Sequence, residues 1–171
     1  MDEAGRGAAA DDPFGVFGFA PSMDLDLDEL ERRYLAASRT THPDFHVDVE
    51  PAHAAAMIAR AATVNDAYRV LRDPWRRARL LCEQLESGVM ERNKALDPAF
   101  LMDAMELAEQ VATTDDAERE ALVSTLQVRV DDQLRQVTNA LRAGAAARAA
   151  TLLHQSTYLR KALADASGAG R

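Results

Sequence analysis

Helical periodicity is the feature that most limits what this chain can fold into. After residue 26, apolar side chains recur at spacings of three and four, and no stretch of useful length alternates apolar and polar residues. Spacings of three and four place side chains on one face of an α-helix, whereas a half-buried strand needs a period of two. The aromatic content is only 5%, and Ala and Leu abound, which also favours helix packing. We therefore predict an all-α protein.

The amino-terminal part of the sequence predicts a small helical unit. A short aromatic segment at 13–19 comes first. Asp26 and Glu29 have the spacing of a capping box, and the helix that they open is expected to stop at Pro43. A second apolar stripe runs over 57–71 at helical spacing. These elements predict a compact helical unit before residue 75.

Asp-Pro pairs mark where later helices begin. Asp73 and Asp97 are each followed by proline, the pattern of an N-cap and a first-turn residue. The segment at 87–96, between the helices that these pairs open, is the predicted domain boundary. Beyond it we expect an up-down-up bundle of three helices at about 98–112, from Thr113 or Thr114 to Gly144, and at about 145–166. The predicted organisation is a disordered leader (1–11), a helical unit with its connecting helix (12–88), the bundle (89–166) and a tail (167–171).

Composition excludes several classes of function. Twenty Lys and Arg residues against 28 Asp and Glu give a net charge of -8, the wrong sign for binding a nucleic-acid backbone. The single cysteine, Cys82, excludes an internal disulfide and a cysteine-based zinc site, and it fits a reducing compartment. No run approaches the roughly 20 apolar residues of a transmembrane helix. The acidic start does not resemble a targeting segment, so we expect a cytoplasmic protein without membrane contact.

The tripeptide His42, Pro43 and Asp44 points most directly to a function. Proline fixes a turn at the end of a helix, and the histidine and the aspartate are presented on the loop. Taken alone, the tripeptide also fits a histidine C-cap followed by a Pro-Asp turn.

The segments on both sides of the tripeptide resemble a J domain, the module by which co-chaperones dock onto DnaK-type heat-shock ATPases. Asp12-Pro13-Phe14 with Phe17-Gly18 resembles its first helix, and VNDAYRVLRDP at 64–74 resembles the helix that follows the tripeptide. The resemblance covers residues from about 11 to 75. It implies an antiparallel helical hairpin with short flanking helices, in which His42, Pro43 and Asp44 bind the chaperone.

The remainder of the chain resembles one family of J proteins. It has neither a Gly/Phe-rich linker nor cysteine-rich zinc repeats, and FLMDAMEL at 100–107 followed by a helical bundle is similar to the HscB family. Members are co-chaperones of iron–sulfur cluster assembly. The resemblance implies two partners: a DnaK/HscA-type ATPase for the J domain, and an IscU-type scaffold protein for the bundle.

Helical geometry and the resemblance together select candidate binding residues. At 100° per residue, Phe100, Ala104, Leu107 and Val111 share one stripe within about 60°, which leaves neighbouring apolar residues off the core face. These either pack on adjacent helices or form a partner surface. The client-binding residues that the resemblance implies are Leu101, Met102, Met105, Glu106, Glu109 and Tyr158.

Three arginines of the helix before the tripeptide are the remaining candidates. Arg32 and Arg39, seven residues apart, share the face opposite the apolar stripe, and Arg33 lies beside them. We expect these cations to steer docking onto an acidic surface of the ATPase. The alternative is that they form a solvated helix face.

The sequence contains no set of residues for chemistry of its own. It has no nucleophile–base pair, no glycine-rich phosphate loop and no metal-ligand pattern, so we expect a protein that is not an enzyme and has no cofactor. Two alternatives stay open: a J-type co-chaperone for another client, and a metal-binding or histidine-phosphotransfer bundle. A metal site would use His42 and His46, with His53 nearby, and phosphotransfer would use an exposed histidine such as His42 or His154.

Overall fold

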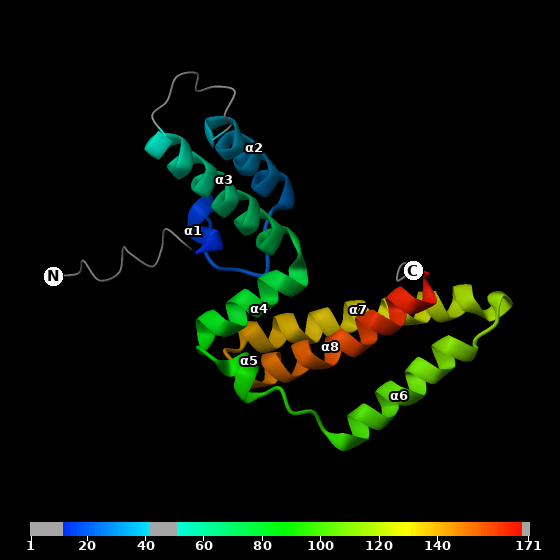
Figure 1. Ribbon diagram of the computed structural model, residues 1–171. Coiled ribbons are helices and arrows are strands. Elements are labelled where there is room, and N and C mark those ends of the chain that lie inside the picture. The colour runs from blue at the N-terminus through cyan, green and yellow to red at the C-terminus, as the bar shows by residue number, and fades with distance from the viewer. Residues whose placement is uncertain (1–11, 42–50, 169–171) are drawn as a thin grey trace. The chain divides into compact units, whose positions relative to one another are not determined.

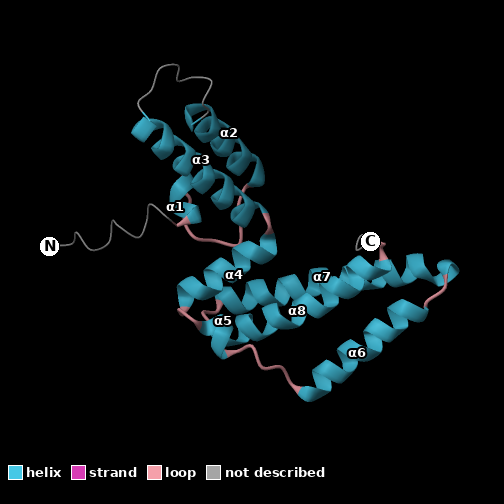
Figure 2. Cartoon of the chain, in the orientation of Figure 1, coloured by secondary structure: helices cyan, strands magenta, loops and turns pink. Residues whose placement is uncertain are grey.

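The computed structural model describes residues 12–41 and 51–168. Every regular element in these ranges is a helix, as Figure 2 shows, so the prediction of an all-α protein is confirmed. The tripeptide His42–Asp44, the predicted leader and residues 169–171 lie outside the described residues. The helices are α1 (Pro13–Phe17), α2 (Leu27–Thr41), α3 (Pro51–Arg72), α4 (Pro74–Leu85), α5 (Val89–Arg92), α6 (Pro98–Thr113), α7 (Asp116–Arg142) and α8 (Ala146–Ala166).

The chain divides into two compact units, Met1–Arg77 and Ala78–Arg171. The boundary drawn from the sequence, 87–96, falls later in the chain, whereas this division falls within α4. Most of α4 belongs to the second unit, because side chains of α4 form hydrogen bonds with backbone groups of that unit. The Cys82 thiol donates to the Ala146 carbonyl at 3.3 Å, and the Glu83 carboxylate accepts from the backbone N–H groups of Gly88 and Met90 at 2.6 and 3.1 Å.

The first unit is built on the antiparallel pair α2 and α3, with α1 packed against α3 (Figure 1). Its core holds apolar side chains from all three helices, among them Phe14, Leu30 and Leu71, each fully buried. Tyr34 of α2 and Tyr68 of α3 stack with ring centroids 4.1 Å apart. The apolar stripes predicted at helical spacing thus face each other between α2 and α3, which pairs the two helices in a hairpin.

The predicted helix starts are largely confirmed. Asp26 Oδ1 accepts from the N–H groups of Asp28 and Glu29 at 3.0 Å, and Asp73 and Asp97 cap α4 and α6 in the same manner. The start predicted for the long bundle helix at Thr113 or Thr114 is wrong. Thr113 belongs to α6, and Asp115 is the N-cap of α7 because its carboxylate accepts from two free N–H groups.

In the second unit, α8 packs along α7 and also contacts α6 and α5. At the end where α6 finishes, Val111, Leu126, Ala162 and Ala166 form a buried cluster. The short helix α5 was not expected, because a single turn is too brief to show a period. Its Val89 and Met90 are buried, and the Met90 carbonyl lies 2.8 Å from Nε2 of His154. No helix in the described ranges is long and apolar enough to cross a membrane.

Candidate partner-binding surfaces

Two of the three arginines on α2 are exposed. The side chain of Arg32 is 71% exposed and forms a surface ion pair with Glu29, with 2.5 Å between Nη2 and Oε2. Arg39 is also exposed, and between the two on the same face lies Leu35, which is 47% exposed. The outer face of α2 therefore combines two cations with one apolar side chain.

Arg33 has a different environment, because the structure places it in contacts within its own unit. Its Nη1 donates to the carbonyl oxygens of Phe17 and Gly18 at 2.7 and 3.1 Å, and its guanidinium lies 4.3 Å from the ring centroid of Phe19. Its Nε also donates to Glu29 at 2.6 Å. Arg33 thus links α2 to the carboxyl end of α1, a role that helical spacing does not reveal.

Both arginines act on the Glu29 carboxylate. Hydrogen bonds from Arg33 first, and then from Arg32, hold the pKa of Glu29 below its ordinary value. Two guanidinium groups thus share one carboxylate in the first turns of α2. Of the three arginines, Arg32 and Arg39 are exposed to solvent, whereas Arg33 donates to carbonyl oxygens at the carboxyl end of α1.

The second surface lies on α6 and the adjacent part of α8. Met102 is 63% exposed and Met105 is 73% exposed, so the neighbouring helices do not cover them. Tyr158 of α8 is 45% exposed, and its ring packs edge-on against Phe100, with centroids 5.8 Å apart. Leu101 is half-buried. We call this surface, with exposed Glu106 and Glu109, the α6 face.

The predicted core stripe of α6 points to the bundle side. Val111 is buried, and Phe100, Ala104 and Leu107 are half-buried. Met102, Met105 and Glu109 therefore lie on the side of α6 away from this stripe, as the 100° rotation per residue predicts.

The charge of this part of the chain has one sign. Between Lys94 and Arg119 there is no Lys or Arg, and the acids of α6 include Glu106 and Glu109 on the α6 face. Exposed methionines rimmed by carboxylates suit a partner that presents apolar side chains beside basic ones.

The described residues hold no group of three side chains suited to bind a metal ion. Of the histidines considered above, His42 and His46 lie outside the described residues, and the side chain of His53 is not described. The Cys82 thiol is buried, and burial is the main cause that raises its pKa to about 11, with smaller contributions from Glu83 and Glu86. A thiol with such a pKa is a poor nucleophile at neutral pH.

Solved structures share this architecture. The chaperone HscB from Vibrio cholerae superposes with a TM-score of 0.80 at 27% identity, over 93% of this chain and 97% of that one. The human co-chaperone HscB superposes with a TM-score of 0.84 at 22% identity, over 99% of this chain and 85% of that one. An amino-terminal J domain followed by a helical bundle defines the class: a J-type co-chaperone.

Sequence comparison narrows the class to a family. A Bordetella petrii protein described as a co-chaperone protein HscB homolog is 40% identical over 135 residues, which cover 78% of each chain. The family model described as the HSCB C-terminal oligomerisation domain matches residues 96–167. The chain belongs to the HscB family of co-chaperones.

Proposed function

We propose that this protein acts in the cytoplasm as a co-chaperone that stimulates ATP hydrolysis by a DnaK/HscA-type chaperone and delivers an IscU-type scaffold protein to it during iron–sulfur cluster assembly. The observation that carries the proposal is the exposed α6 face. A helix that leaves two methionines and a tyrosine neighbour in solvent, within the region that the HscB family model matches, has the properties of a partner-binding surface.

On the chaperone side, His42, Pro43 and Asp44 engage the ATPase and bias it towards its hydrolysing state. Arg32 and Arg39 on the outer face of α2 orient the encounter by attraction to an acidic surface, an effect on association rate more than on affinity. Arg33, in this proposal, acts as a positioning residue, because its donors hold α1 against α2.

On the client side, the α6 face binds the scaffold. Met102, Met105 and Tyr158 supply adaptable apolar contact, and Leu101 supports it from its half-buried position. Glu106 and Glu109 select a basic rim on the client. When one chain carries both partners, each raises the effective concentration of the other. The ATPase, not this protein, performs the chemical step.

Single-turnover ATP hydrolysis tests the proposal. The rate is measured for candidate DnaK-type ATPases alone, with this protein, with an iron–sulfur scaffold, and with both. We expect stimulation that is synergistic when both are present, and we expect Asp44→Asn to abolish it while the thermal denaturation curve stays unchanged. Stimulation without synergy would support the action of the J domain on the ATPase but leave the client of the bundle open. Retained stimulation by the Asp44→Asn variant would refute the docking role of the tripeptide.

A further inference from the structure

The bundle of the second unit is closed at one end and open at the other. Beyond the buried cluster around Val111 and Leu126, α6 diverges from α7 towards its amino-terminal end (Figure 1). In this opening lies a groove of about 300 Å³. Phe100, Leu107 and Leu159 contribute its apolar wall, and each is half-buried rather than buried. Side chains at core positions thus stay in contact with solvent.

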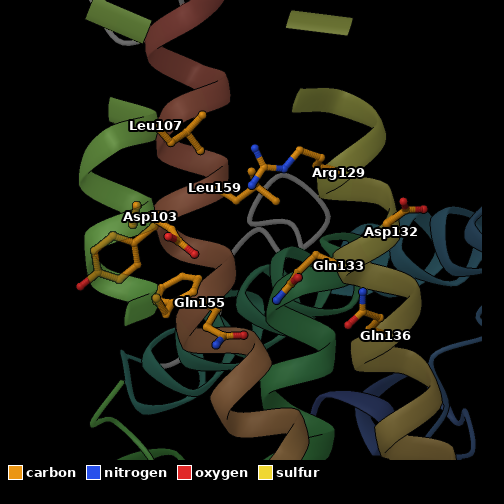
Figure 3. A pocket seen from close by; sticks show the side chains of 11 residues that line it. Asp103, Leu107, Arg129, Asp132, Gln133, Gln136, Gln155 and Leu159 are labelled. Carbon is orange, nitrogen blue, oxygen red and sulfur yellow. The ribbon is translucent and has the colours of Figure 1, made fainter. Parts of the chain in front are cut away.

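Polar side chains from all three helices line the same groove. Figure 3 shows Asp103 of α6 and Gln155 of α8 across from Arg129 and Gln136 of α7. Within the described residues none of these four has a hydrogen bond or ion pair to another side chain or carbonyl. Gln133, which also lines the groove, donates to the Leu152 carbonyl at 3.0 Å. The groove therefore offers an anion, a cation and two amides to a ligand.

These features specify the ligand. A volume of about 300 Å³ is at the small end of the range for ligand pockets, enough for one large side chain and adjoining backbone. The two glutamine amides and Arg129 are suited to the N–H and C=O groups of a polypeptide backbone. Asp103, without a basic neighbour on its own helix, is suited to a Lys or Arg of the ligand. The α6 of a second copy does not fit, because it carries no cation.

The groove and the α6 face share one side chain, because Tyr158 lines the groove and also belongs to the α6 face. We propose that the groove binds a short segment of the client protein that carries one large apolar side chain next to a basic one. This inference rests on the proposed function and adds a second contact, on the bundle side of α6, to the contact on its outer face.

Scaffold binding to the full chain, measured by isothermal titration calorimetry with a purified IscU-type scaffold protein, tests the inference with two matched pairs of variants. Asp103→Lys reverses the charge in the groove, and Glu120→Lys makes the same change on an exposed part of α7. Gln136→Trp fills the groove, and Gln127→Trp places the same ring elsewhere on α7. Each control lies nine residues before a groove residue of α7 (Arg129 or Gln136), half a turn away around the helix.

We expect each groove variant to weaken scaffold binding by about tenfold or more, and each control to stay within about twofold of the wild type. Equal affinities within both pairs would overturn the inference. If Met105→Ala weakens binding in that case, the proposed function stands and only the groove is excluded. No binding of the scaffold by the wild-type protein would overturn both. All four substituted positions are exposed, and the Trp pair remains a test if a charge reversal impairs folding.

Discussion

Arg32 and Arg33 provide the sharpest test of how the first unit works, because these adjacent arginines have different predicted roles, docking for Arg32 and internal stability for Arg33. Both donate to Glu29, but only Arg33 also reaches the carbonyls of Phe17 and Gly18 and the ring of Phe19. We predict that Arg33→Met destabilises the unit without a direct effect on docking. Arg32→Met should slow stimulation of the ATPase and leave stability nearly unchanged.

The size of the effect follows from the contacts that are lost. Two hydrogen bonds to carbonyl oxygens contribute about 1 kcal/mol each, and the cation–π contact contributes about 0.5–1 kcal/mol, which gives about 2–3 kcal/mol for Arg33→Met. A change of this size lowers the melting temperature of a unit this small by about 10 °C or more. For Arg32, whose side chain is 71% exposed, the expected change is within about 0.5 kcal/mol.

Thermal denaturation followed by circular dichroism measures the first effect, and single-turnover hydrolysis well below either melting temperature measures the second. Arg33→Lys is the control for charge, because lysine keeps the cation but cannot form the same fork of hydrogen bonds; it should recover only part of the lost stability. An unchanged melting temperature for Arg33→Met, or an equal loss for Arg32→Met, would refute the reasoning.

Three further outcomes are expected. Leu126→Ala should lower the free energy of unfolding by about 2–5 kcal/mol, because Leu126 is fully buried in the cluster of the second unit; a loss below about 1 kcal/mol in urea denaturation would contradict this. Cys82, with a pKa of about 11, should resist alkylation at pH about 8 in the folded protein and react in urea, as mass spectrometry would show; rapid labelling of the folded protein would contradict its burial. The lowered pKa of Glu29 means that its stabilising contribution is present above its ordinary pKa of 4.5 and is lost as the pH falls through the lower folded value. Arg33→Met should therefore lose less stability than the wild type between neutral pH and pH about 3, measured as the urea midpoint; equal losses would show that the pair does not act through this carboxylate.

Local chemistry explains why much of the fold was predictable. Asp26, Asp73 and Asp97 cap their helices in the structure because a carboxylate followed by free N–H groups is satisfied within a few residues. The helix start at Asp115 and the single turn α5 were missed, since competing caps stand side by side at the first and no full period exists at the second. Both errors concern signals shorter than the window over which periodicity can be read.

The candidate site divides in the same way. Met102 and Met105 are exposed as the helical wheel indicates, because rotation per residue fixes which side of α6 they occupy. Their role as a client surface stays a prediction, as do the roles of Leu101, Glu106, Glu109 and Tyr158. The contacts of Arg33 could not be predicted in this way, because folding alone brings the carbonyls of Phe17 and Gly18 to it and no spacing on α2 indicates them.

Sequence alone determined the helical class, most of the helix starts and which residues share one side of a helix. These features depend on residues within about four positions of one another. Tertiary structure decided what spacing cannot show. The stack of Tyr34 on Tyr68 and the hydrogen bond from Cys82 to Ala146 each join residues far apart along the chain. The divergence of α6 from α7 (Figure 1) likewise depends on how distant segments pack. Whether an apolar residue on α6 becomes core or lines an open groove depends on how closely the next helix approaches, and that distance is set by the packing of the whole bundle.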